Sequence, residues 1–280
     1  MKRIMTVQDI SCVGKCSLTV ALPIISAAGV EASVLPTAVL STHTGFSKFT
    51  FKDLTDEITP IKDTLKELEI DFDAIYTGYL GSFLQIELVE EFIDTFKKKD
   101  TFVLIDPVMA DNGRLYPGFT PEFAARMARL CARADLIIPN LTEASFMLGI
   151  PYTPEYDEKY VRDVLKRLTA LGCPRAALTG ISLEGDKIGV YSYDSVADSY
   201  FYYANEKLPV SYHGTGDTYA SAALGAIMRN IPIEDSLGIA VDFTLECMKK
   251  TAADPTHRFY GVNFESALGY YISRIEEKAK

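Results

Sequence analysis

The sequence predicts an α/β protein: a three-layer α/β/α sandwich around a mostly parallel central sheet. Short apolar runs typical of buried strands alternate with longer helical patterns along the whole chain. Several of the apolar runs end in polar residues, as expected where a parallel sheet binds a ligand beyond its carboxyl edge. At 280 residues the chain can bury one large core, and no repeat, low-complexity tract or linker divides it. We therefore expect a single domain over residues 1–280.

The individual elements follow from the same patterns. Buried-strand patterns cover residues 4–8, 32–36, 74–79, 102–106, 136–139, 176–179, 188–193 and 199–203, the last two as a hairpin. Helical patterns cover residues 54–68, 85–98, 121–132, 155–171, 217–229, 233–250 and 263–278. A further helix is expected to open at Asn140.

The amino-acid composition and net charge limit the kinds of molecule that the protein is expected to bind. Hydrophobic residues make up 48% and charged residues 24%, as in soluble globular proteins. The net charge of −10 argues against nucleic acid as a partner, although a divalent cation can still bridge carboxylates to a nucleotide. No apolar run is long enough to span a membrane, and the run at residues 4–7 is too short for a signal peptide. Five scattered cysteines suit a reducing cytoplasm, which is the expected location.

The segment His213-Gly214-Thr215-Gly216-Asp217 is the strongest functional signal. Its glycines allow a tight turn and a close approach of the backbone to a ligand. The small residues that follow indicate a helix, whose first N–H groups would favour a phosphate at the turn. Asp217 is then suited to accept a proton from a substrate hydroxyl. A structural acidic helix N-terminus explains this segment, taken alone, equally well.

Two further strand ends carry carboxylates. Asp106 follows an apolar strand with Asp111 nearby, and the two could hold a hydrated Mg²⁺ beside phosphates. Asp106 could equally be a turn acid that bonds to its own backbone. Asn140 and Glu143 fit a capping box, and Glu143 fits a water-mediated Mg²⁺ ligand as well.

Other features do not indicate a site. The stretch Gly14-Lys15-Cys16-Ser17 is not a P-loop, because position 9 is Asp and position 16 is Cys. His43 and His213 are too isolated for a metal cluster, and Cys12 and Cys16 lack further zinc ligands. Each histidine is expected to be a hydrogen-bonding or a structural residue.

Five segments occur in one order along the chain: residues 41–46, 77–79, 106–109, 139–144 and 214–217. Together they resemble the pyridoxal kinases of the ribokinase-like superfamily, and the resemblance covers nearly the whole chain. It implies ATP-dependent phosphorylation of the 5′-hydroxyl of pyridoxal, pyridoxamine or pyridoxine with Mg²⁺, with K⁺ as a candidate additional cation. By analogy it also implies a homodimer.

The resemblance also assigns roles to residues. Asp217 is the base, with Gly214, Thr215 and Gly216 as the anion hole. The implied vitamin-binding residues are Asp9, Thr44, Gly45 and Tyr79. The implied nucleotide-side residues are Asp106, Asp111, Tyr116, Asn140, Glu143 and Thr179, of which Asp106 and Glu143 also serve the metal.

The chain departs from the family pattern at three places. Asp9 stands where the family usually has serine, and it could pair with a protonated ring nitrogen or an amine, or be a solvated turn acid. Ala110 stands where glycine is common, and the lysine that bacterial members often place near Thr179 is missing.

Other functions remain open. Hydroxymethylpyrimidine kinase of thiamine biosynthesis belongs to the same superfamily, and Asp9 leaves it open although residues 41–46 favour vitamin B6. A sugar kinase is disfavoured, because no strand-rich insertion follows the first strand. A non-catalytic relative that binds pyridoxal phosphate or nucleotide would not need Asp217 together with Asp106 and Glu143.

Overall fold

A large sheet organises the protein. The computed structural model describes residues 1–279. The strands are β1 (Arg3–Val13), β2 (Glu31–Thr42), β3 (Phe51–Asp53), β4 (Ala74–Thr77), β5 (Phe102–Ile105), β6 (Ala110–Asp111), β7 (Arg114–Leu115), β8 (Leu136–Ile137), β9 (Arg175–Ile181), β10 (Lys187–Asp194) and β11 (Ser199–Glu206). Nine of them form one sheet in the order β11-β10-β9-β8-β5-β4-β1-β2-β3, and β6 pairs with β7 separately.

The sheet is parallel at its centre and antiparallel at its edges. All pairs from β9 across to β2 are parallel. β10 and β11 add to one side and β3 to the other as antiparallel strands. The mostly parallel sheet and the hairpin expected from the sequence are confirmed.

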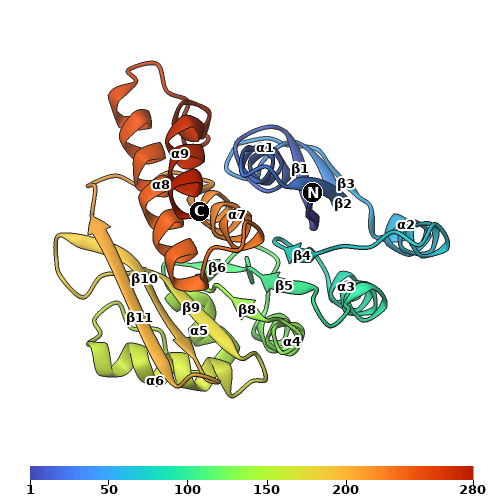
Figure 1. Ribbon diagram of the computed structural model, residues 1–280, viewed down its shortest axis with the longest axis horizontal. Coiled ribbons are helices and arrows are strands. Elements are labelled where there is room, and N and C mark those ends of the chain that lie inside the picture. The colour runs from blue at the N-terminus through green and yellow to red at the C-terminus, as the bar shows by residue number, and fades with distance from the viewer. Residues whose placement is uncertain (280) are drawn as a thin grey trace.

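Helices cover both faces of this sheet, which gives the three layers (Figure 1). They are α1 (Leu18–Ala27), α2 (Thr55–Glu67), α3 (Phe83–Phe96), α4 (Pro121–Cys131), α5 (Leu141–Leu148), α6 (Glu158–Thr169), α7 (Thr215–Met228), α8 (Ile233–Ala253), the 3₁₀ turn η1 (Phe264–Ala267) and α9 (Leu268–Lys278). On β5, Val103 and Ile105 pack toward α2–α6, whereas Leu104 packs toward α1 and α7–α9. Alternation along the strands therefore divides the core into two apolar layers.

The expected strands and helices are all present, with shifted ends. The sequence patterns missed α1, β3 and the β6–β7 hairpin. Helix α1 is mostly apolar, with Thr19 and Ser26 as its only polar residues, and it contains Pro23, so it shows neither a clear amphipathic stripe nor an uninterrupted helical sequence. β3 has three exposed residues, and β6 and β7 have two residues each, too few to show a period.

Strand β1 is irregular at Asp9. Gln8 pairs with Pro36 but Ile10 pairs with Val39, so the register against β2 shifts between them. Pro36 has no N–H group to donate to the ladder, which suits such a break. Asp9 is 6% exposed inside the strand, so the alternative of a solvated turn acid is wrong.

No helix within residues 1–279 is long and apolar enough to cross a membrane. All five cysteines are free thiols.

Helix α7 is held in place by small residues on its buried faces. A Cβ on Gly225 would overlap the Tyr271 hydroxyl and lie 2.9 Å from Cβ of Ala28. The Tyr271 hydroxyl also donates a hydrogen bond to the Ala222 carbonyl at 2.8 Å. Close contacts to α1 and α9 therefore fix the position of α7.

We expect Gly225→Val to lower the free energy of unfolding by about 1–3 kcal/mol, because the added volume forces α7 away from α9. Urea denaturation measures the change. Gly269→Ala in α9 is the matched control, because a Cβ there meets nothing within 4 Å. Equal stabilities of the two variants would contradict the packing argument.

Candidate active site

The candidate residues gather where the central strands end and α7 begins. Asp9 lies in β1, Tyr79 follows β4, Asp106 follows β5 and Asn140 follows β8. Asp217 lies in the first turn of α7. The charges of both Glu143 and Asp217 raise the pKa of Asp106, which places these carboxylates near one another.

The turn before α7 is closely packed against the loop between β1 and α1. Gly214 has φ 76°, and a Cβ there would overlap the carbonyl oxygen of Lys15. Both the positive φ and this contact require glycine. Gly216, in contrast, faces open space. The first N–H groups of α7, at Thr215 and Gly216, have no partner within the helix and are suited to bind an anion.

Asp217 is half-buried and anchored by one oxygen. Its Oδ2 accepts a hydrogen bond from the Ser17 backbone N–H at 2.9 Å. Burial raises the pKa of Asp217 to about 6, the Ser17 N–H opposes the shift, and the nearby charge of Asp9 adds to it. A carboxylate with this pKa is a stronger base than an ordinary aspartate and is still ionised at neutral pH.

Ser17 also contacts Asp9. Its hydroxyl donates to Asp9 Oδ1 at 2.6 Å, and both residues are 6% exposed. Burial raises the pKa of Asp9, and the Ser17 hydrogen bond lowers it. Ser17 has φ 49° and ψ −131°, a conformation that costs a non-glycine residue about 1–3 kcal/mol.

The nucleotide-side candidates form a second group. Glu143 is 3% exposed and accepts from the Met109 N–H at 3.1 Å and from the Asn140 N–H at 2.9 Å. The Asn140 side chain accepts from the Glu143 N–H, so the capping box is confirmed. Burial raises the pKa of Glu143 and of Asp106. The capping box explains why Glu143 lies where it does. In this position the charge of Glu143 also acts on Asp106.

Three more candidates surround this group. Asp111 accepts from the N–H and the side-chain amide of Asn112, so it shapes the β6–β7 turn. The pKa of Tyr116 is raised by burial and by the charges of Glu143 and Asp111, which places its hydroxyl near them. The Thr179 N–H donates to the Pro139 carbonyl at 3.0 Å, so Thr179 lies next to Asn140.

The vitamin-side candidates lie at the other end of the site. Thr44 and Gly45 are exposed in the loop after β2. His43 anchors this loop: its Nδ1 accepts from the Gly45 N–H at 2.9 Å, and its Nε2 therefore donates to the Tyr260 carbonyl at 3.0 Å. Burial raises the pKa of Tyr79, and the charge of Asp9 adds to the shift.

The donor set suits a hard cation. Within residues 1–279 no group of three or more His, Cys, Asp or Glu side chains could hold a metal alone. Asp106 and Glu143 supply two buried carboxylates that repel each other. Mg²⁺ typically takes one or two carboxylates together with phosphate oxygens and waters, so these residues fit Mg²⁺ delivered with a nucleotide.

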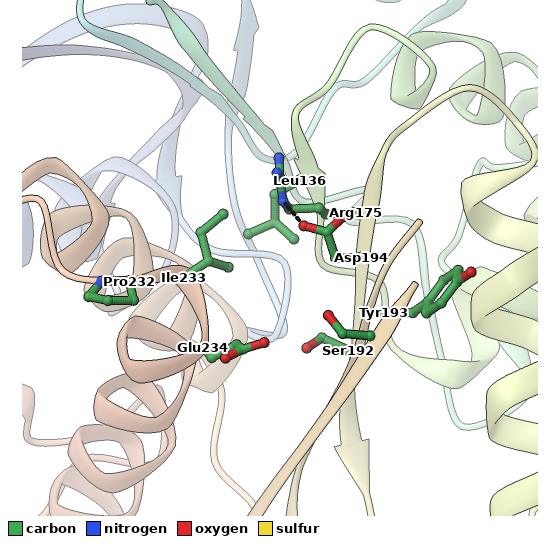
Figure 2. Close-up of a pocket in the computed structure, with 9 residues that line it drawn as sticks. Leu136, Arg175, Ser192, Tyr193, Asp194, Pro232, Ile233 and Glu234 are labelled. Carbon is green, nitrogen blue, oxygen red and sulfur yellow. Dashed lines mark hydrogen bonds and ion pairs between the residues drawn. The ribbon is translucent and has the colours of Figure 1, made fainter. Parts of the chain in front are cut away.

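A separate cavity of about 240 Å³ lies at the opposite edge of the sheet (Figure 2). Leu136 and Arg175, at the starts of β8 and β9, line it together with Ile233 of α8. Arg175 Nε pairs with Asp194 Oδ2 at 2.6 Å between the adjacent strands β9 and β10, on one wall of the cavity. The cavity is therefore distinct from the candidate residues.

Comparison with known proteins identifies the family. The family model described as phosphomethylpyrimidine kinase matches residues 22–263. The chain belongs to this family. The crystal structure of a candidate phosphomethylpyrimidine kinase from Bacteroides thetaiotaomicron, in a form with pyridoxal, is 39% identical with a TM-score of 0.92, and the match covers 96% of this chain and 95% of that one.

Other kinases agree with this membership. Pyridoxal kinase from Lactobacillus plantarum is 29% identical with a TM-score of 0.90, covering 99% of both chains. Pyridoxine kinase of Bacillus subtilis (strain 168) is 28% identical over 205 residues, 71% of each protein. The expected resemblance to pyridoxal kinases and the ribokinase-like fold are confirmed, and the chain is a phosphotransferase of a kinase family.

The sequence patterns missed Ser17. The stretch Gly14-Lys15-Cys16-Ser17 does not match a P-loop, yet it packs against the Gly214 turn and bonds to Asp217. A serine before an apolar helix resembles an ordinary N-cap, so nothing in the local sequence distinguishes it.

We expect Asp106→Asn to raise the free energy of unfolding by about 1–2 kcal/mol at pH 8, because it removes a charge buried beside Glu143 and Asp217. The pKa of Asp106 is raised in the folded state, so this carboxyl costs stability as pH rises above its unfolded value near 3.8. The gain of the variant should therefore shrink toward pH 4. Urea denaturation at both pH values measures it, and a gain that does not depend on pH would contradict the charge argument.

Proposed function

We propose that the protein transfers the γ-phosphoryl group of ATP to the 5′-hydroxyl of a vitamin B6 vitamer. The observation that carries this proposal is Asp217, a carboxylate with a pKa of about 6 beside the free N–H groups that begin α7. Family membership supports a kinase, and the relative crystallised with pyridoxal supports this class of acceptor.

In the proposed reaction the 5′-oxygen attacks the γ-phosphorus, and its proton passes to Asp217. The bond from the γ-phosphorus to the β–γ bridging oxygen breaks, so the products are ADP and the phosphate ester. The Thr215 and Gly216 N–H groups, behind Gly214, stabilise charge on the transferred group. In this reaction the protein positions the reacting groups and provides the base that accepts the proton.

Asp106 and Glu143 would hold Mg²⁺ through oxygen ligands, as their donor chemistry suits. When bound, this ion would neutralise phosphate charge. Asp111, Tyr116, Asn140 and Thr179 are proposed to line the nucleotide side of the site.

We propose that Asp9, Thr44, Gly45 and Tyr79 receive the vitamin. Asp9 Oδ1 is bonded to Ser17, which leaves Oδ2 for the ring nitrogen of the substrate. A buried carboxylate favours a protonated pyridine, because the pair neutralises charge in a site of low dielectric.

The direct test is phosphorylation by ATP and Mg²⁺ of pyridoxal, pyridoxamine, pyridoxine and hydroxymethylpyrimidine, compared by kcat/KM. We expect a B6 vitamer to have the highest value. Failure of all four substrates with folded, nucleotide-binding protein would contradict the proposal.

Hydroxymethylpyrimidine kinase is the second candidate function. The matching family model carries the phosphomethylpyrimidine kinase description, and Asp9 could also bind a ring amine. The same assay decides between the two, because preference for the pyrimidine would retain the mechanism and change the substrate.

We expect Asp217→Asn to lower kcat by about two to four orders of magnitude, because the amide cannot accept the proton. Calorimetric titration with ATP should still show nucleotide binding. A variant with near-normal kcat would rule out Asp217 as the base.

We expect kcat/KM to fall about tenfold per pH unit below about pH 6 and to be level above pH 7, because the base acts only when deprotonated. The Asp9 charge raises the pKa of Asp217, so in the Asp9→Ser variant the fall of kcat/KM should begin at a lower pH. Initial rates from pH 5 to 8 measure both effects. If kcat/KM fell at the same pH in the Asp9→Ser variant as in the wild type, the two carboxylates would not interact.

A further inference from the structure

Ser17 links the two carboxylates that the proposed function places at opposite ends of the substrate. Its backbone N–H donates to Asp217 Oδ2 at 2.9 Å, and its hydroxyl donates to Asp9 Oδ1 at 2.6 Å. Within residues 1–279 no other side-chain hydrogen bond engages Asp217, and its Oδ1 stays free. Each acid thus has one oxygen fixed by Ser17 and one left for substrate.

The conformation of Ser17 is not explained by its place in the fold. Ser17 is the N-cap residue of α1, where a serine side chain usually accepts a hydrogen bond from the first turn of the helix. Here the side chain makes no cap hydrogen bond and turns to Asp9 instead. The residue also has φ 49° without being glycine. A strained backbone conformation that is not compensated by a helix-capping hydrogen bond is typical of residues at functional sites.

The surrounding loop holds Ser17 in this conformation. The Lys15 carbonyl packs against Gly214, and the Thr19 hydroxyl donates to the Cys16 carbonyl at 2.8 Å. The Ser17 carbonyl still accepts from Ala21 N–H at 2.9 Å, so the helix begins normally after it. The two donors of Ser17 are therefore fixed relative to β1, α1 and α7 together.

We propose that Ser17 is a positioning residue that sets the placement of Asp9 and Asp217 relative to each other, and so matches the distance from ring nitrogen to reacting hydroxyl in the substrate. This inference rests on the proposed function. It predicts that the Ser17 hydroxyl acts on turnover through Asp9, not through the stability of the loop. The other titratable groups that interact with the charge of Asp9 or Asp217 are Cys16, Tyr76, Tyr79, Asp106 and Tyr116.

A double-mutant cycle tests the link. Ser17→Ala removes the hydroxyl and keeps the N–H, and we expect it to lower kcat about tenfold and to raise the KM of the vitamin while the KM of ATP stays the same. In the Asp9→Ala background the same change should alter kcat less than about twofold, because its partner is already absent. An equal loss of kcat in both backgrounds, or no loss in either, would overturn the proposal.

Two further variants separate positioning from strain. Ser17→Gly also lacks the hydroxyl but accepts φ 49° freely, so it should be as slow as Ser17→Ala and at least as stable. Recovery of wild-type kcat with glycine would show that backbone distortion caused the loss and would overturn the proposal. Ser26→Ala, at an exposed position of α1, is the control and should keep wild-type rates.

A substrate-free measurement separates this inference from the proposed function. Carbon-13 NMR of the aspartate carboxyls, assigned with Asp9→Asn, should show a higher pKa for Asp9 in Ser17→Ala than in the wild type, because the hydroxyl hydrogen bond is lost. An unchanged pKa would overturn the link even in an active kinase. The shift would persist in a protein that phosphorylates no vitamin, and then only the proposed function would fail.

Discussion

The contact between Gly214 and the carbonyl of Lys15 is the constraint on which the rest of the site depends. It joins the turn before α7 to the loop before α1, and it leaves no room for a side chain at Gly214. The same two segments are also joined by the hydrogen bond from the Ser17 N–H to Asp217. Two segments 200 residues apart in the chain thereby form one site.

Much of this arrangement could be predicted from the sequence, because it follows from local rules. Alternation of apolar runs and helical periods indicated the parallel sheet, and strand ends identified Asp106 and Asn140. The Gly214–Asp217 turn could be recognised only together with the other four segments of the resemblance, because a structural helix N-terminus explains it equally well alone. The hydrogen bonds of Ser17 and the shift in register at Asp9 could not be predicted, because they depend on contacts between segments that lie apart in the sequence. Helix α1 was missed for a different reason: its mostly apolar sequence has no polar face that would reveal the helical period.

The site concentrates negative charge where water is scarce. Burial raises the pKa values of Asp9, Asp106, Glu143 and Asp217. Neighbouring charges add to the shift at Asp106, through Glu143 and Asp217, and at Asp217, through Asp9. Backbone N–H groups offset part of this cost at Glu143, through Met109 and Asn140. These buried carboxylates lower the stability of the protein, and they are the same groups that are proposed above to hold a cation and to accept a proton. Such a loss of stability is common at functional sites.

The separation of Ser17 from Asp217 also has a consequence for synthesis on the ribosome. At about 5–20 residues per second, roughly 10–40 s pass between translation of the two positions. During that time the Ser17 N–H has no Asp217 carboxylate to donate to, and Gly214 is not yet present to pack against Lys15. The contacts that fix the loop around Ser17 can therefore form only after α7 has been translated. No truncated or stalled chain that lacks α7 therefore carries a complete site.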